Sequence, residues 1–294
     1  MLFTSDHKAF RESVRGVLAR EVVPHAEEWE AAGTFPAHRV FKALGSAGLL
    51  GLEYDPAYGG QGADHSYTVI LGEELGRMGC GGVGMAIAVQ TDMATPSLHK
   101  HGSHELKQRY LVPALAGEVV AAIAVTEPGA GSDVAGLTTR AERDRDDWVI
   151  NGGKLYITNG TQADWFCLLV RTSGEGGYRG MSQLVFPAGT PGFSVSRKLR
   201  KLGNHSSDTA ELSFDGARVP VANTIGEIGR GFQQQMGQFQ HERMIAAYTT
   251  VGAMDTALAR TAAYLRDRNA FGAPLLSKQY IQFRLAELAA EVLP

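Results

Sequence analysis

Apolar residues recur at helical spacing through the first third of the chain. Phe10, Val14 and Leu18 lie four residues apart within 6–32, and Pro24 is expected to break or bend the helix that they indicate. Similar spacing predicts further helices at 40–50, 65–77, 85–101 and 106–115. This part of the chain is therefore predicted to be helical.

The pattern changes after residue 118. Between 119 and 225 it consists of short runs, alternating or wholly apolar, that are separated by glycine and polar turns, which is typical of a mostly antiparallel sheet. From Gly231 the helical pattern returns and is predicted to continue to the end of the chain. The sequence thus predicts an α+β fold of three parts: an N-terminal helical domain (1–118), a middle antiparallel β domain (119–228) and a C-terminal helical domain (229–294).

Composition narrows the class of protein. A chain of 294 residues with 44% hydrophobic and 20% charged residues is typical of a soluble globular protein. A formal net charge of −3 indicates neither nucleic acid nor an anionic membrane as a partner. Two cysteines, Cys80 and Cys167, argue against a disulfide framework and fit a reducing cytoplasm, and no signal peptide or membrane span is visible. The nine histidines show no metal-ligand spacing, so no metal site is predicted.

Two motifs have structural and functional interpretations. The string 79–84 satisfies G-x-G-x-x-G, but a dinucleotide site needs a preceding strand, and the residues before it are helical. We interpret it as a break between helices. A basic cluster could meet the phosphates of a coenzyme A nucleotide, but a solvated strand edge is favoured; its members are Arg197, Lys198, Arg200, Lys201 and His205.

The run 119–125 is uninterruptedly apolar, suits a buried strand, and leads into Thr126–Asp133, spelled TEPGAGSD. Its two glycines leave backbone N–H groups free to approach a ligand, and such amides can form a concave nest for a phosphate. Thr126 and Ser132 add hydroxyl groups, and Pro128 stiffens the exit from the strand. By composition alone, an ordinary turn explains the same residues.

Glu242 is the candidate for acid–base chemistry. On a helix over 231–248 it shares a face with Phe239, Ile245 and Ala246. A carboxyl group among apolar neighbours is costly to ionise, so its pKa is expected to rise toward neutrality, which suits a general base. The alternative is an ion pair between Glu242 and a lysine or arginine elsewhere.

Four signatures, in order, resemble those of the acyl-CoA dehydrogenase family: TEPGAGSDVA at 126–135, YITNG at 156–160, LG at 202–203 with SSDTAELSF and RVP after it, and RNAFG at 268–272. The resemblance covers nearly the whole chain. It implies FAD-dependent dehydrogenation of an acyl-CoA thioester to the trans-2-enoyl-CoA, with electrons passed to an electron-transferring flavoprotein. Glu242 directly before Arg243 looks like the arrangement of the long-chain and isovaleryl-CoA dehydrogenases, in which this carboxylate removes the α-proton.

The resemblance also implies roles for other residues. FAD would be bound by Val125, Thr126, Gly131, Ser132, Tyr156, Ile157 and Thr158, and the FAD of a neighbouring subunit by Arg268, Phe271 and Gln279. The second group implies a homo-oligomer, a tetramer or a dimer. Ser132, Gln240 and Arg243 would meet the acyl-CoA substrate.

Some questions stay open at the level of sequence. The run 80–98 resembles that of citronellyl-CoA-type dehydrogenases, and its small residues would make room for a long or methyl-branched chain or would serve helix packing: Gly81, Gly82, Gly84, Ala86 and Ala88. Family members continue with further helices after the point where this chain ends, so we expect either a truncated chain or completion by another polypeptide. Two alternatives remain: a flavin oxidase on the same fold, and a non-catalytic flavoprotein subunit.

Overall fold

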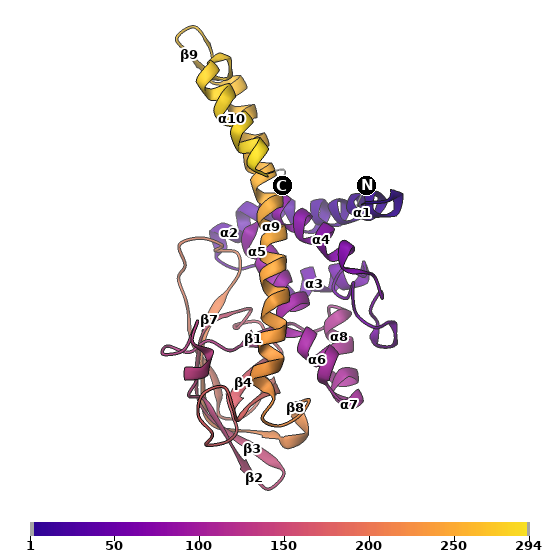
Figure 1. Cartoon of the computed structure of the whole chain (residues 1–294), viewed down its shortest axis with the longest axis vertical. Helices are drawn as coiled ribbons and strands as arrows, with labels where there is room; N and C mark the ends of the chain where they lie inside the picture. Colours follow the sequence, from indigo (N-terminus) through magenta and orange to yellow (C-terminus); the bar gives the residue numbers. More distant parts are fainter. Residues whose placement is uncertain (1–2, 293–294) are drawn as a thin grey trace.

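Three blocks of structure follow one another along the chain in the computed structural model, which describes residues 3–292 (Figure 1). A group of helices comes first, a β-sheet follows, and one long helix then runs past both. A last helix lies beside the far end of the long one. The α+β architecture predicted from the hydrophobic pattern is therefore confirmed. The exact limits of the three domains stay a prediction.

The N-terminal helices begin and end where local chemistry favours it. Pro24 lies in a 3₁₀ turn (Val23–His25) between two helices, so the predicted break is confirmed. Asp64 caps the helix predicted at 65–77, because its Oδ1 accepts the Ser66 N–H at 2.8 Å. The helices of this block are α1 (Ser5–Glu21), α2 (Ala26–Ala32), α3 (Ala37–Ser46), α4 (His65–Arg77), α5 (Gly81–Ala88), α6 (Pro96–His101), α7 (His104–Leu106) and α8 (Val112–Leu115).

The helix predicted at 85–101 is broken in the middle. α5 passes into a wider π-helical segment, Val89–Ala94, and α6 begins separately at Pro96. Proline suits the first position of a helix because it has no N–H to satisfy there, but for the same reason it cannot continue the helix before it. A second π-helical segment, Lys107–Leu111, joins α7 to α8.

The middle block is one eight-stranded sheet in the order β6-β7-β3-β2-β4-β5-β8, with β1 paired to β4. Most neighbours are antiparallel, as predicted, but β4 pairs in parallel with β1 over its length and with β2 at one position. Strands β1 and β4 are buried along nearly their whole length, which explains their continuous apolar runs. The strands are β1 (Ala121–Ala124), β2 (Arg140–Asp144), β3 (Asp147–Thr158), β4 (Trp165–Arg171), β5 (Met181–Pro187), β6 (Phe193–Lys198), β7 (Thr209–Pro220) and β8 (Thr224–Ile225).

The structure agrees with the structural interpretations of the basic cluster and of the glycine string at 79–84. β6 is an edge strand, where Arg197 pairs with Glu211 at 2.9 Å and Lys198 donates to the Gly33 carbonyl at 2.6 Å. The glycine string at 79–84 follows helix α4 rather than a strand, so it lacks the context of a dinucleotide site.

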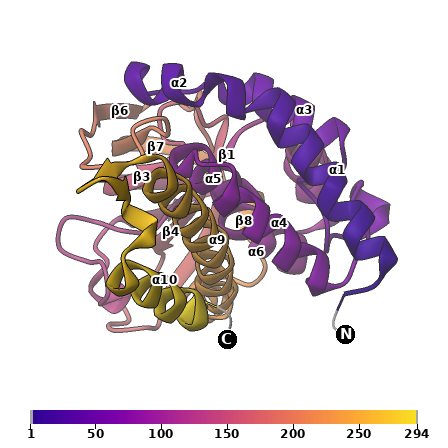
Figure 2. The same ribbon diagram turned by 90° about the horizontal axis from the view of Figure 1, so that it is seen from above.

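A single helix of 37 residues carries the chain from the sheet to the far end of the molecule. Its first turns lie beside the sheet and its middle packs against α4 (Figures 1 and 2). The prediction that helix continues to the end is wrong over a short stretch, because Phe271 and Gly272 have positive φ angles of 53° and 78° and turn a hairpin there. The elements are α9 (Gly231–Asp267), β9 (Asn269–Ala270), β10 (Ala273–Pro274) and α10 (Gln279–Val292).

Within residues 3–292, none of the helices combines the length and the apolar character that a membrane crossing requires.

Close packing against α4 sets the position of α9. A methyl group on Gly76 would overlap the Thr249 carbonyl oxygen, and one on Gly252 would overlap the Glu73 carbonyl oxygen. Both positions therefore need glycine, because any side chain would push the two helices apart. Ile245 is only 1% exposed in this interface.

A buried ion pair fastens the loop after β1 to β3. The Lys154 ammonium, which is 1% exposed, donates to Glu127 Oε1 and to the Val125 carbonyl, each at 2.9 Å. Glu127 also accepts the backbone N–H groups of Thr138 and Thr139. Burial alone would raise the pKa of Glu127, but the charge of Lys154 and side-chain hydrogen bonds from Thr139, Lys154 and Thr138 lower it to about 2. The loop is thus held from both sides by one carboxylate.

Replacing Lys154 is expected to be costly for folding. Lys154→Met should lower the free energy of unfolding by about 3–5 kcal/mol, because Glu127 would stay buried without its counter-charge. Urea denaturation followed by circular dichroism measures this change. The exposed pair Lys42–Glu118, also 2.9 Å apart, provides the control. Lys42→Met should cost less than about 1 kcal/mol, and equal losses in the two variants would contradict the anchoring role.

Candidate active site

The predicted cofactor loop and the helix of the predicted base meet in one apolar cluster. Its buried members come from the loop and the sheet, and three side chains of α9 pack against it. The loop and sheet members are Val125, Ala130, Val134, Leu137, Leu169 and Met181, and those of α9 are Phe232, Met236 and Phe239. Glu242 follows Phe239 by three residues, less than one helical turn, so the predicted base lies near the loop.

The loop at 126–133 is open to a ligand. Glu127 and Ala130 exchange two backbone hydrogen bonds, at 2.9 and 3.2 Å, which close its first turn. An added Cβ on Gly129 or Gly131 would meet nothing within 4 Å among the described residues, and neither glycine has a positive φ. Internal packing and backbone conformation therefore do not require glycine there. Gly129 and Gly131 leave open space in front of the backbone, and the exposed Ser132 lies next to Gly131.

A β-bulge turns Tyr156 out of β3. The register of β3 with β7 shifts just before Ile157, and Tyr156 has a φ of 63°. The Tyr156 ring is 66% exposed, whereas the Ile157 side chain is buried in the core. The Leu155 N–H donates to the Thr126 carbonyl at 2.8 Å, so this part of β3 and the loop lie side by side. Tyr156, the residue after Leu155, therefore lies near Thr126, while the buried Ile157 can offer a ligand only its backbone.

Glu242 lies half-buried where α9 meets the sheet. The Gln238 amide donates to its Oε1 at 3.0 Å, and the Gln235 amide approaches the same oxygen at 3.5 Å. Gln235 in turn accepts from Gln183 of β5 at 2.8 Å. Neither of these two helical glutamines is among the site residues predicted from the sequence. Their spacing, four and seven residues before Glu242, places them on its face of the helix and could have indicated them.

Burial raises the pKa of Glu242 to about 7. The Gln238 amide and Arg243 act in the opposite direction, and the negative charge of Asp92 raises the pKa further. Within residues 3–292 no ion pair forms with Glu242, and the Arg243 guanidinium donates to the Phe239 carbonyl at 3.2 Å instead. The alternative of an ion-paired Glu242 is therefore not supported, and a carboxyl group with this pKa can exchange a proton near neutral pH.

A cavity of about 410 Å³ lies between α4–α5 and α9. Its wall on α9 begins at Ile245 and Ala246, about one turn after Glu242, and extends as far as Arg260. Methionines and glycines of the facing helices complete it, so its lining is mostly apolar.

The five small residues singled out in the sequence divide into two groups. Gly81, Gly84 and Ala88 line this cavity. Gly82 and Ala86 do not: a methyl group on Gly82 would overlap a serine hydroxyl of the neighbouring loop, and Ala86 is fully buried. Both interpretations of the run, room for a ligand and close packing, thus apply to different members of it.

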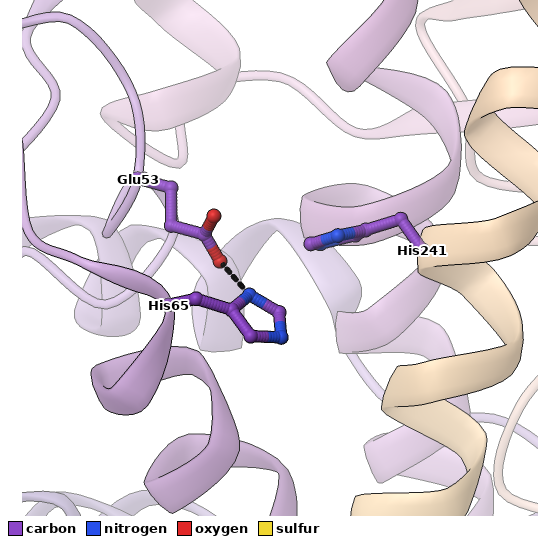
Figure 3. A group of neighbouring side chains, drawn as sticks. All are labelled: Glu53, His65 and His241. Atoms are coloured by element: carbon purple, nitrogen blue, oxygen red, sulfur yellow. Dashed lines mark hydrogen bonds and ion pairs between the residues drawn. The ribbon is translucent and has the colours of Figure 1, made fainter.

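A larger cavity, of about 1130 Å³, lies along the start of α9. Beside it, Glu53, His65 and His241 face one another (Figure 3). One carboxylate oxygen and one ring nitrogen of each histidine lie within 4.8 Å of one another. His65 bonds Glu53 at 2.7 Å and the Tyr248 hydroxyl at 3.0 Å, while His241 bonds Asp92 at 3.0 Å. These bonds make the group a polar tie between α4 and α9. Histidine spacing could not have found it, because its members are far apart in the sequence.

The other predicted residues do not converge on the loop within one chain. Arg268, Phe271 and Gln279 lie at the hairpin and at the start of α10, at the end of α9 away from the sheet (Figure 1). Phe271 is 95% exposed. Gln240 and Arg243 are exposed on α9 on either side of Glu242.

The glycine loop, the exposed aromatic side chain and the carboxyl group with a raised pKa are features expected of a cofactor-dependent enzyme. Three domain families match the chain: Acyl-CoA dehydrogenase, N-terminal domain, over residues 4–118; the middle domain over 122–217; and the C-terminal domain over 229–293. The chain belongs to the acyl-CoA dehydrogenase family, flavoprotein oxidoreductases that act on CH–CH bonds.

Individual relatives agree with this assignment. The mitochondrial long-chain specific acyl-CoA dehydrogenase of Sus scrofa is 36% identical over 293 residues, which cover 99% of this chain and 67% of the pig protein. The mitochondrial isovaleryl-CoA dehydrogenase of Solanum tuberosum is 35% identical over 289 residues, 98% of this chain and 70% of that protein. The crystal structure of acyl-CoA dehydrogenase complexed with FAD from Bacillus anthracis superposes with a TM-score of 0.93 at 31% identity, over 99% of this chain and 49% of that one.

The burial of Glu242 predicts a pH-dependent effect on stability. Its folded pKa, about 7, lies above the ordinary value of 4.5, so between these values the folded state binds more protons than the unfolded state and stability falls as pH rises. Glu242→Gln removes the titrating carboxyl group, and with it this loss of stability at higher pH. The variant should therefore gain stability over the native protein from pH 5 to pH 8, measured by urea denaturation at both pH values. A constant difference across this range would contradict the raised pKa.

Proposed function

We propose that this protein catalyses the FAD-dependent dehydrogenation of an acyl-CoA thioester to its trans-2-enoyl-CoA, with Glu242 as the base. The observation that carries the proposal is a half-buried carboxyl group with a pKa of about 7, on the helix that packs against the loop at 126–133. Its position directly before Arg243 resembles the arrangement in long-chain and isovaleryl-CoA dehydrogenases, the names that the two relatives above carry.

Two hydrogens leave the substrate by different routes. Bound flavin supplies the acceptor for the hydride that leaves the β-carbon with its electron pair. The Glu242 carboxylate takes the α-proton, and the electrons of the broken α-C–H bond become the second bond between the α- and β-carbons. Glu242 ends the step neutral. The apolar Phe239 and Ile245 on its face of α9 favour that neutral form because they keep water away.

The residues around the loop suit FAD. Three hydroxyl groups offer donors and acceptors to its polar edges: Thr126, Ser132 and Thr158. The exposed Tyr156 ring can cover one face of an aromatic cofactor. Open space at Gly131 lets its backbone approach the cofactor closely. Val125 and Ile157 are buried and would contribute backbone groups.

The cavity of about 410 Å³ would receive the acyl chain. It begins one turn after Glu242, which is where the chain beyond the reacting carbons has to go. Gly84 and Ala88 widen it, so we favour a long or methyl-branched acyl group. The exposed Ser132, Gln240 and Arg243 would meet the polar part of the thioester.

Arg268, Phe271 and Gln279 are proposed to bind the FAD of a second copy. They lie away from the loop of their own chain, so this role requires a dimer or a tetramer. An arginine suits a pyrophosphate because its guanidinium donates two parallel hydrogen bonds.

Substitution of the base tests the mechanism. In Glu242→Gln, bleaching of the flavin by acyl-CoA under anaerobic conditions should slow by at least about 10²–10⁴-fold, because no group of suitable pKa remains to take the α-proton. FAD content and ligand binding should be unchanged. Glu227→Gln alters an exposed acid near the start of the same helix and should bleach normally. Full bleaching in Glu242→Gln would place the base elsewhere.

The electron acceptor is proposed to be an electron-transferring flavoprotein, as the family resemblance implies. Stopped-flow mixing of the substrate-reduced protein with a purified electron-transferring flavoprotein should reoxidise the flavin, whereas mixing with air-saturated buffer should leave it reduced for minutes. Complete reoxidation by air within seconds would instead identify an oxidase.

A further inference from the structure

Gln238 occupies a break in a neighbouring helix. It is 6% exposed, and its side chain reaches from α9 to the point where the π-helical segment ends and α6 begins. In an uninterrupted α-helix the Ser97 N–H would donate to the Met93 carbonyl, four residues earlier. Here the Ser97 N–H donates to Gln238 Oε1 at 3.2 Å, and the Met93 carbonyl accepts from Gln238 Nε2. The side-chain amide thus replaces the backbone bond that is lost at the break.

These contacts fix which way the amide faces. Gln238 Oε1 also accepts the Ser97 hydroxyl at 2.6 Å, so two donors from one residue hold the oxygen end. The amide nitrogen then faces away from Ser97. One of its hydrogens is donated to the Met93 carbonyl of the π-helical segment, and the other to Glu242 Oε1 of α9 at 3.0 Å. A flipped amide would present its oxygen to the Met93 carbonyl and to the ionised Glu242 carboxylate, and its NH2 group to the Ser97 N–H, so these three bonds would be lost.

We infer that Gln238 is the positioning residue for the base, and that Ser97 locks its amide so that an N–H always faces the Glu242 carboxylate. The inference rests on the proposed role of Glu242. A donor held in this way favours the ionised carboxylate, which is the form that must be present before the α-proton can be taken. It also limits the rotation of a side chain whose orientation relative to the substrate decides the rate.

Other groups near Glu242 act on it through charge rather than through a fixed hydrogen bond. Asp92, from the π-helical segment, disfavours the carboxylate, while His241 and Arg243 of α9 favour it. On the sheet side, the buried Cys167 of β4 faces Glu242 as a neutral thiol, because burial raises its pKa to about 12. Only Gln238 donates to the carboxylate from within 3.0 Å among residues 3–292.

The test is a titration of Glu242 in two variants. Gln238→Met keeps the length of the side chain but removes the amide, and Ser97→Ala removes only the hydroxyl that holds the amide oxygen. Infrared difference spectroscopy follows the protonated carboxyl band directly, with Glu242→Gln as the blank, and the pH profile of kcat/KM follows it in turnover. Gln233→Met, an exposed glutamine on the same helix, is the matched control.

We expect the pKa of Glu242 to rise by about one unit in Gln238→Met, because the hydrogen bond to a charged group is lost. Ser97→Ala should shift it in the same direction by less, and Gln233→Met should not shift it. The loss of kcat/KM in Gln238→Met should be greatest at low pH and shrink as pH rises. A folded Gln238→Met protein with the native pKa would overturn the inference.

The infrared measurement separates this inference from the proposed function. If Glu242→Gln keeps full activity, Glu242 is not the base, yet the infrared titration still reports whether Gln238 sets its pKa. If Glu242→Gln is inactive and Gln238→Met leaves the pKa and the pH profile unchanged, the function stands and the positioning role falls. Thermal denaturation of each variant identifies any loss of folding, in which case Ser97→Ala, which keeps the backbone bonds at the break, decides the matter.

Discussion

The candidate site depends on the ion pair between Glu127 and Lys154. Within the loop at 126–133, backbone hydrogen bonds between Glu127 and Ala130 close only the first turn, and the exposed Gly129 and Gly131 pack against nothing among the described residues. One buried carboxylate, that of Glu127, then joins the loop to β3 and to the chain at 138–139. Lys154 stands directly before the bulge that turns Tyr156 outward, so the loop and the exposed ring share one anchor.

The position and the pKa of Glu242, the proposed base, depend on helix packing and burial rather than on an ion pair. Glu242 is carried by a long helix whose distance from α4 is set by glycines, and its carboxyl group is drawn into a partly apolar setting. Burial makes the charged form costly, and the amide of Gln238 offsets part of that cost. The balance leaves the group near neutrality, where one residue can both accept and release a proton. The break at Pro96 contributes to this pKa because it leaves the Met93 carbonyl and the Ser97 N–H without helical partners, and these two groups hold the Gln238 amide.

Local pattern was a good guide to the elements of this chain. The helix at 65–77 was predicted at its observed limits, and the start of the long helix at Gly231 and the break at Pro24 were also correct. Capping residues, proline and hydrophobic spacing act within a few residues, so they can be read directly. Errors fall where the backbone departs from a regular repeat, at the two π-helical segments and at the hairpin around Phe271, because hydrophobic spacing carries no signal for such departures.

The sequence by itself determined the order of helix and sheet, the open loop, and the residue types that acid–base chemistry requires, because these are properties of short segments. Only the tertiary structure decided the partners. It paired Glu127 with Lys154, brought Gln238 to the gap between Met93 and Ser97, and divided the small residues of α5 between a cavity wall and a packed interface. Such contacts join segments far apart in the chain, and their energies come from burial and from hydrogen-bond geometry that exist only once those segments have packed together.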